Sequence, residues 1–381
     1  SALKEIGENS LDARASHVSV FASGGGLKLL RVVDNGCGIR HDSLALAARR
    51  FATSKITRFS DLKKVASFGF RGEALCSISS VASLTIISKT ADSPTAFTAS
   101  YEDGEMLSIP EPAAGKAGTS IIIKDMFATM PSRRKALSSA SEEFNRIDGV
   151  VRRYALHYGE QAGFVLQKPS SGSSQRRAVQ TVFSTKKGMP FVDRVRTLFT
   201  QDIASNLLEP VTCEANWATS ARASLTGPVC FRARVVGTHP NYAPKRGDFI
   251  LLVNGRLVQS PALRRSLETA YETSLPRGAH PWLYVALEVP HVRCDVNVHP
   301  TKASVGLVDE EEIAIQLSIA LKEAVEAVNS SRTFSSTQLT LASVFKRTRP
   351  ADETEVANEG QRPRRRRRRS DDRGSDDDDD D

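Results

Sequence analysis

The sequence has few cysteines and no arrangement of them that would cross-link a fold or hold a metal ion. Its five cysteines are an odd number, and no two form a Cys-x-x-Cys pair, which argues against a disulfide framework and against a zinc site. No run approaches the roughly 18 consecutive apolar residues of a membrane helix, and the first residues carry no signal-peptide pattern. We therefore expect neither a membrane protein nor a disulfide-rich secreted protein, and a reducing compartment is the simplest interpretation.

The sequence has a modest excess of positive charge. Lysine and arginine number 52 against 44 aspartates and glutamates, which gives a net charge of +8. The last twenty residues hold eight arginines and eight aspartates, so the whole excess lies in the body of the chain. A mildly basic body fits a polyanionic partner such as nucleic acid, and it fits ordinary solubility equally well.

Length and pattern predict two folded domains and a tail. The chain has 381 residues, which exceeds the roughly 100–200 of a typical domain. Residues 1–183 alternate helical and strand patterns, and residues 187–330 form a second α+β pattern. Residues 331–381 are expected to be a linker and a disordered charged tail, because such blocks bury no apolar surface. The arginine run at 364–369 is typical of a nuclear address or a nucleic-acid arm, and equally of low-complexity sequence.

Individual elements follow from the hydrophobic period. Helices are expected at 3–15, 43–51, 142–158, 191–199, 261–275 and 310–328. Strands are expected at 18–21, 27–33, 84–88, 95–101, 119–124, 229–237, 249–253 and 282–289, with a hairpin loop at 168–177. The three strands between 84 and 124 are predicted to form a meander.

The first pattern with chemical meaning lies on the opening helix. Glu5, Asn9 and Asp12 are spaced so that they share one helix face. Asn9 can supply a neutral oxygen ligand to Mg²⁺, and Glu5 can accept a proton from a water aimed at a phosphate. The alternative is a polar helix face in water, which this spacing alone does not exclude.

A glycine turn follows the apolar strand, with the sequence DNGCGI at 34–39. An Asn-Gly pair is sufficient for a β-hairpin turn. The functional interpretation makes Asp34 the acceptor for an exocyclic purine amine, with Gly36 and Gly38 leaving room for a flat ring. Gly38 favours this second interpretation, because a hairpin turn alone does not require it.

Hydroxyl groups, a lysine and further glycines come next. Thr53, Ser54 and Lys55 precede the string FGFRGEAL at 68–75, which continues into a helical pattern. Glycines at the start of a helix leave backbone N–H groups directed outward, where they can cradle a phosphate. Neither a Walker A loop nor a dinucleotide-binding fingerprint occurs in the sequence.

In this order, the patterns resemble the ATPase region of the MutL family of DNA mismatch-repair proteins, whose nucleotide fold is shared with gyrase B, Hsp90 and the sensor histidine kinases. The strings FGFRGEAL at 68–75 and DVNVHPTK at 295–302 are typical of MutL, whereas ATSK at 52–55, RRKAL at 133–137 and HPWLY at 280–284 are most similar to its first eukaryotic homologue. The resemblance covers about residues 1–341. It implies an α+β fold, with a two-layer α/β sandwich ATPase domain followed by a smaller ribosomal-S5-like α+β domain.

The resemblance also implies roles for single residues, with ATP and Mg²⁺ as ligands. Glu5 would be the general base, Asn9 would hold Mg²⁺, and Lys302 would reach the γ-phosphate from the second domain. For Lys302 the alternative is a surface lysine in a loop. The residues implied to bind the nucleotide and its metal are Asn9, Asp12, Asp34, Gly36, Gly38, Thr53, Ser54, Lys55, Gly69, Gly72 and Thr119.

Partners are implied in the same way. Sequence-independent contacts to DNA phosphates are expected at Arg256, Arg264 and Arg265, and at the basic run 133–135, although solvated surface charge is an equal alternative. A second MutL-type subunit, MutS-type mismatch recognition proteins and a nuclear location are also implied, and no membrane.

Two hypotheses of function follow. In the first, the chain is a slow ATPase whose nucleotide switches domain arrangement, DNA contact and partner recruitment. In the second, it is a DNA- or partner-binding scaffold without ATP turnover. A topoisomerase or chaperone of the same fold is a third interpretation, and a topoisomerase would need a strand-cleaving tyrosine region that is not found after residue 330. The family's preceding segment and its C-terminal dimerisation domain, which carries an endonuclease motif in some members, are expected to lie outside this chain, so no nuclease activity is expected from it.

Overall fold

The computed structural model describes residues 2–345 except 54, 56–67, 70–71, 171–177, 216–227, 243, 245–246, 277 and 296–304. Beyond residue 328 it describes only the backbone of the last helix. Residues 1–331 form one compact unit, and residues 332–381 form a second, of which only that helix end is described. The following description concerns the first unit.

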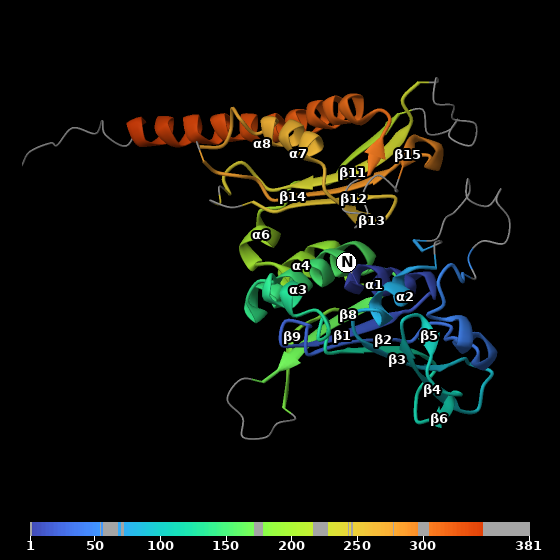
Figure 1. The fold of residues 1–381 in the computed structure, drawn as a ribbon. Coiled ribbons are helices and arrows are strands. Elements are labelled where there is room, and N and C mark those ends of the chain that lie inside the picture. The colour runs from blue at the N-terminus through green and yellow to red at the C-terminus, as the bar shows by residue number, and fades with distance from the viewer. Residues whose placement is uncertain are drawn as a thin grey trace, which may run out of the picture. The chain divides into compact units, whose positions relative to one another are not determined.

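A mixed sheet occupies the first half of the described chain (Figure 1). Its nine described strands are β1 (His17–Ser23), β2 (Leu29–Asp34), β3 (Ser83–Lys89), β4 (Ala96–Glu102), β5 (Glu105–Met106), β6 (Glu111–Ala113), β7 (Gly118–Lys124), β8 (Gly163–Pro169) and β9 (Val179–Ser184). They lie in the order β5-β4-β3-β7-β2-β1-β8-β9, and β6 pairs with β4. Among the described pairs of this sheet, only β1 and β8 run parallel.

One part of this sheet differs from the sequence prediction. The strands between 84 and 124 do not form a meander, because β7 pairs with β3 and β2 rather than with β4. The strand Gly118–Lys124 carries apolar side chains on both sides of its pleat, as Ile121, Ile122 and Ile123 show. Its place between β2 and β3 keeps this strand inside the sheet, as the burial of most of its residues requires.

Helices cover one face of this sheet (Figure 1), and most of them contribute buried residues to a core shared with it. They are α1 (Ala2–Asp12), α2 (Ala74–Ser79), α3 (Pro131–Lys135), α4 (Ala140–Tyr158), α5 (Phe191–Leu198) and α6 (Gln201–Ser205). The longest, α4, begins where the Ser139 side chain accepts a hydrogen bond from the backbone N–H of Glu142, the usual N-terminal cap of a helix. The two-layer α/β arrangement predicted for the first domain is confirmed.

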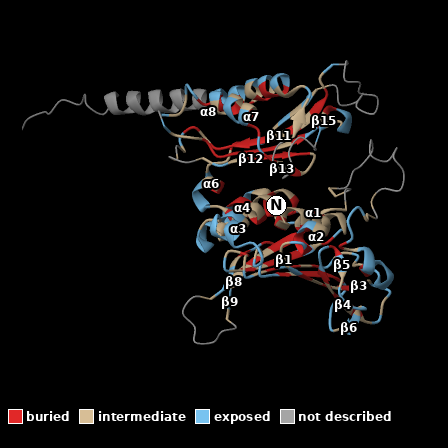
Figure 2. Cartoon of the chain, viewed as in Figure 1, coloured by how far each residue is buried: buried red, intermediate tan, exposed pale blue. Residues whose placement is uncertain are grey.

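A second sheet follows, in the order β10-β11-β14-β12-β13 among the described strands. Its members are β10 (Val211–Ala215), β11 (Phe231–Gly237), β12 (Phe249–Val253), β13 (Arg256–Val258) and β14 (Leu283–Glu288). The strand β12 is buried on both faces: Ile250 and Leu252 join the first core, and Leu251 and Val253 join a second one. That second core is closed by α7 (Pro261–Thr269) and α8 (Glu310–Phe345). Figure 2 shows the buried residues on the strands of both sheets.

Several predicted elements have different ends or a different type. The helix expected at 43–51 is a short 3₁₀ helix, η1 (His41–Leu46), and α7 ends at Thr269 rather than at 275. The helix α5 was placed in the second domain, yet its buried residues Val195 and Leu198 belong to the first core. The division at 183/187 therefore remains a prediction.

Candidate functional site

The opening helix α1 forms one wall of a large cavity. The cavity measures about 1340 Å³, and its lining includes Glu5 and Asn9 from α1. Ile6, on another side of α1, is fully buried in the first core. The helix is thus held by its apolar face while its polar face is presented to the cavity, as the predicted spacing requires.

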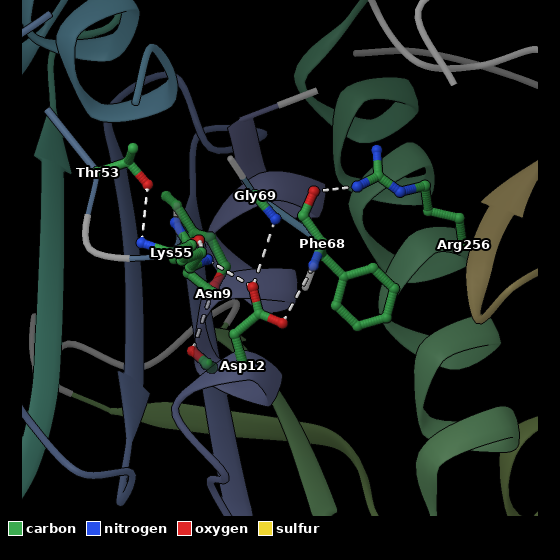
Figure 3. A network of polar contacts seen from close by, with 9 residues as sticks. Asn9, Asp12, Thr53, Lys55, Phe68, Gly69 and Arg256 are labelled. Carbon is green, nitrogen blue, oxygen red and sulfur yellow. Dashed lines mark hydrogen bonds and ion pairs between the residues drawn. The ribbon is translucent and has the colours of Figure 1, made fainter. Parts of the chain in front are cut away.

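Lys55 connects the polar groups of α1 (Figure 3). Its ammonium nitrogen donates hydrogen bonds to Asn9 Oδ1 at 2.8 Å and to Asp12 Oδ2 at 2.5 Å. The Thr53 hydroxyl accepts a bond from the Lys55 backbone N–H at 3.2 Å, and so fixes the turn that carries the lysine. An amide oxygen and a carboxylate therefore converge on one cation.

The glycine-rich segment lies on the same groups. Asp12 accepts hydrogen bonds from the backbone N–H of Phe68 at 3.2 Å and of Gly69 at 3.4 Å. A Cβ at Gly69 would lie 3.0 Å from Lys55 Nζ and 3.2 Å from Asn9 Oδ1, so a side chain there would crowd both polar atoms. Gly72 has φ +61°, and a Cβ there would fall 2.2 Å from the carbonyl oxygen of Ala52.

Asp34 is the centre of a second polar group, at the end of β2. The Ser10 hydroxyl donates to its Oδ2 at 2.9 Å, and the backbone N–H groups of Gly36 and Thr119 donate to Oδ1 at 2.9 and 3.3 Å. Burial raises the pKa of the Asp34 carboxyl, against the lowering effect of these bonds. A carboxylate has about four acceptor positions, so three donors leave it able to accept one more.

The two glycines after Asp34 are explained by packing. A Cβ at Gly36 would lie 2.7 Å from Ala13 Cβ, and one at Gly38, where φ is +75°, would lie 2.2 Å from the Lys89 carbonyl oxygen. Both glycines therefore allow the turn to pack against neighbouring residues, which is a structural reason the sequence did not indicate. Thr119 presents its hydroxyl to Ser88 Oγ at 3.0 Å.

The predicted residues thus fall into two groups joined by α1. Those lining the cavity are Glu5, Asn9, Thr53, Lys55, Gly69 and Gly72. Asp12, Asp34, Gly36, Gly38 and Thr119 are not part of that lining. The groups meet at neighbouring positions of the helix, since Asn9 contacts Lys55 and Ser10 contacts Asp34.

Two predicted residues, Ser54 and Lys302, lie outside the described residues. The segment that carries Lys302 is bounded by a two-stranded ribbon, β15 (Cys294–Asp295) and β16 (Gly306–Leu307). The role of Lys302 stays a prediction.

The candidate DNA contacts separate into exposed and buried arginines. Arg264 and Arg265 are exposed on α7, where they bond to Glu268 Oε1 and to the Pro261 carbonyl oxygen. Arg256 is only 5% exposed, and its Nη2 donates to the carbonyl oxygen of Phe68. The prediction that Arg256 contacts DNA is therefore corrected, because its guanidinium is directed into the protein.

Sequence reasoning missed several polar groups. Ser10 is 2% exposed and holds Asp34, but a serine inside an amphipathic helix gives no signal of that role. Glu8, also 2% exposed, accepts a hydrogen bond from the Tyr154 hydroxyl at 2.7 Å. At helical spacing Glu8 lies on the other side of α1 from Leu3, Ile6 and Ser10, so nothing in the sequence signals its burial, and its partner Tyr154 comes from α4.

None of the described helices is long and apolar enough to cross a membrane.

Comparison with protein families matches both parts of the chain. Residues 1–115 match the family described as histidine kinase-, DNA gyrase B-, and HSP90-like ATPase. Residues 197–326 match the family described as DNA mismatch repair protein, C-terminal domain. The second match includes the strands β11 to β14, which lie in the predicted smaller α+β domain.

Curated relatives match along most of the chain. The DNA mismatch repair protein MLH1 of Saccharomyces cerevisiae is 36% identical over 346 residues, which cover 89% of this chain and 42% of that protein. The DNA mismatch repair protein Mlh1 of Dictyostelium discoideum is 36% identical over 360 residues, covering 89% of this chain and 40% of that protein. The chain thus spans less than half the length of these relatives.

Solved structures share the fold. The N-terminal domain of a DNA repair protein matches with a TM-score of 0.70 at 22% identity, covering 86% of this chain and 93% of that one. The Aquifex aeolicus MutL ATPase domain complexed with ADP matches with a TM-score of 0.50 at 23% identity, covering 75% of this chain and 90% of that one.

Proposed function

Because the chain belongs to the MutL family of DNA mismatch repair proteins and carries a gyrase- and Hsp90-like ATPase domain, we propose that the α1 cavity binds ATP with Mg²⁺ and hydrolyses it slowly, as a switch. One observation carries this proposal: Glu5 and Asn9 line the same cavity as Lys55 and Gly69. Phosphoryl transfer to water needs a proton acceptor, a metal ligand, a cation and backbone N–H groups that a phosphate can approach. Glu5, Asn9, Lys55 and Gly69 would supply them in this order.

The residues present fit a magnesium ion. Asn9 Oδ1 and the Asp12 carboxylate already converge on a positive charge, the Lys55 ammonium. Oxygen donors of this kind suit Mg²⁺. When bound, the metal would neutralise phosphate charge; Asn9 would hold it.

The remaining residues would bind and orient the nucleotide. The Asp34 carboxylate would accept a hydrogen bond from the adenine amino group, and Gly69 would let the phosphates approach the backbone. A Glu5 side-chain oxygen would take the proton from the attacking water. Thr53, Ser54 and Lys55 would lie over the phosphates, where the lysine adds charge, and Lys302 would reach the γ-phosphate.

The test is the variant Glu5→Ala, with Glu5→Gln as its nearest isostere. Both should lose ATP hydrolysis by at least about a hundredfold, which is the usual contribution of a general base, and both should still bind ATP. Glu73→Gln is the matched control, because Glu73 is a carboxylate that lines the same cavity from the start of α2. If Glu5→Ala hydrolyses ATP at the parental rate, Glu5 is not the base.

The scaffold hypothesis gives a different result. Calorimetric titration of the parent chain with ATP, with and without Mg²⁺, would then show no metal-dependent binding and no turnover. Since no feature of the described residues favours that interpretation over the ATPase, we retain it only as an outcome of this experiment.

The wider role is proposed from the family. ATP binding and hydrolysis would change contacts with the DNA phosphate backbone, with a second MutL-type subunit and with MutS-type mismatch recognition proteins in the nucleus. Arg264 and Arg265 remain the candidate DNA contacts. We assign no nuclease step to this chain.

A further inference from the structure

The turn between β12 and β13 packs against the helices of the ATPase domain. Asn254 and Gly255 both have positive φ, at 48° and 75°, so the turn is tight. The Tyr158 hydroxyl, from the end of α4, donates to the Gly255 carbonyl oxygen at 2.9 Å. A Cβ at Gly255 would lie 2.0 Å from that hydroxyl oxygen and 3.2 Å from the Phe68 ring. The turn is thus fitted closely to both groups.

Arg256, the next residue, holds Phe68 from the second sheet. Its Nη2 donates to the Phe68 carbonyl oxygen, and its guanidinium carbon lies 5.8 Å from the centre of the Phe68 ring. The Phe68 ring also meets Tyr158 edge to face, with centroids 6.0 Å apart. Arg256 of the hairpin therefore contacts both the carbonyl oxygen and the ring of Phe68, and Tyr158 of α4 contacts the ring as well.

The backbone N–H groups of this segment are held from the opposite side. Asp12 of α1 accepts from Phe68 N and Gly69 N, and the same carboxylate binds Lys55. Figure 3 shows the resulting series, from Asn9 and Lys55 through Asp12 and Phe68 to Arg256. These hydrogen bonds connect Asn9, the candidate metal ligand, with Arg256 of the second sheet.

The hairpin also contacts α1 directly. The Lys4 ammonium donates to the Leu257 carbonyl oxygen at 2.6 Å, and Lys4 adjoins Glu5. A displacement of β13 would therefore act on two elements of the cavity at once, on the helix that carries Glu5 and on the glycine segment.

One donor of Arg256 is not satisfied. Its Nη1 is buried and has no hydrogen-bond partner among the described residues. Buried polar groups are nearly always paired, and an exception calls for a reason. Among the described residues, the Phe68 carbonyl oxygen is therefore the acceptor on which this guanidinium depends.

We propose that Arg256 is a positioning residue for the nucleotide site: from the second sheet it sets the Phe68–Gly69 segment, so that the placement of the β12–β13 hairpin determines the shape of the phosphate-binding backbone. This inference rests on the proposed function, because it takes ATP as the ligand of the cavity. It assigns the coupling between the second sheet and the nucleotide site to Arg256, and it does not depend on the role of Lys302.

The test uses the full chain with Arg256→Met, which keeps the apolar stem, and Arg256→Lys, which keeps one donor. The first readout needs no nucleotide: hydrogen–deuterium exchange of the peptide that covers residues 66–75. Loss of a charged hydrogen-bond donor should accelerate exchange there by about tenfold in Arg256→Met, with partial recovery in Arg256→Lys. The matched control is Arg194→Met, because Arg194 is 1% exposed and donates to the Leu156 carbonyl oxygen at 2.8 Å, away from Phe68.

The second readout is nucleotide affinity and turnover. We expect Arg256→Met to weaken ATP binding by about tenfold while the pH profile of turnover keeps its shape. Exchange in 66–75 that matches the parent in both Arg256 variants would overturn the proposal, even if ATP binds. If the parent binds no ATP but the exchange result holds, the function fails and the positioning role stands. Should Arg256→Met not fold, Arg256→Lys and Tyr158→Phe decide: both must accelerate exchange in 66–75, and parental exchange in both would overturn the role.

Discussion

The ammonium nitrogen of Lys55 lies 2.8 Å from Asn9 Oδ1, the oxygen we assign to Mg²⁺. One amide oxygen cannot face an ammonium group and a metal ion at the same distance, because the two cations repel each other strongly. Binding of the metal through Asn9 therefore requires Lys55 to move away from α1, and the phosphates of the nucleotide offer it a new partner.

This exchange predicts the behaviour of Lys55→Met. The variant leaves the Asp12 carboxylate, which is 12% exposed, without its cation, and should lower the free energy of unfolding by about 1–2 kcal/mol. Added Mg²⁺ should raise the melting temperature of Lys55→Met more than that of the parent, because the metal can take the vacated position. Lys55→Arg is the control. If Mg²⁺ raises the melting temperature of the parent and of Lys55→Met equally, the metal and the Lys55 ammonium do not compete for the same position.

Asp34 is expected to determine the purine. Its remaining acceptor position suits the amino group of adenine and opposes the carbonyl oxygen that guanine carries there. In Asp34→Asn the amide can still accept from Gly36 N–H and donate to Ser10 Oγ, so the local fold should persist. We expect ATP affinity to fall by about tenfold and the preference for ATP over GTP to shrink. Competition binding with both nucleotides measures this; an unchanged preference would place the base elsewhere.

For DNA, the exposed arginines of α7 should matter through charge alone. The double variant Arg264→Gln/Arg265→Gln should bind duplex DNA more weakly for every sequence, and the slope of log affinity against log salt should fall by roughly one for each phosphate that is no longer neutralised. Arg40→Gln is the matched control, because Arg40 is an exposed arginine outside the second sheet, paired with Asp42. Identical salt slopes in the parent and the double variant would exclude α7 from the DNA interface.

The sequence predicted what depends on local periodicity. The spacing of Glu5 and Asn9 placed both on the polar face of α1, and the run Phe249–Val253 has the bounds of β12. The strand β10 was missed because it alternates half-buried with exposed residues and holds only Val211 as a large aliphatic residue. The order of β7 within the sheet depends on pairings between distant residues, which periodicity does not encode.

The misassigned residue, Arg256, shows a second limit. An arginine after an Asn-Gly turn is usually exposed, and nothing in its neighbours indicates that the turn is pressed against Tyr158 and Phe68. The burial of Arg256 is produced by residues far away in the chain, since the bond between Gly255 and Tyr158 spans 97 positions and the bond between Arg256 and Phe68 spans 188. Likewise the sequence indicated a turn or a ligand as the reason for Gly36 and Gly38, and their close approach to Ala13 and Lys89 could not be predicted from it.

His157 gives a prediction about pH. Its Nδ1 lies 2.7 Å from the Tyr284 hydroxyl of β14, and burial, aided by Arg194 and Arg234, lowers the pKa of the imidazole to about 4. The unfolded chain has the ordinary imidazole pKa of about 6.5, so on acidification the unfolded state takes up the proton first. The contribution of this group to stability is therefore complete above about pH 6.5 and is lost as pH falls from there towards 4.

At about pH 5 this single group should cost about 2 kcal/mol of unfolding free energy relative to about pH 7.5. In His157→Gln, which keeps a hydrogen-bonding side chain but does not titrate, the loss between the two pH values should be smaller by that amount. Urea unfolding of both proteins at these two pH values measures the difference, and the comparison cancels carboxyl groups such as Asp34, whose raised pKa acts in the opposite direction. A parent that loses no more stability than His157→Gln would show that the imidazole is not held neutral at the junction of α4 and β14.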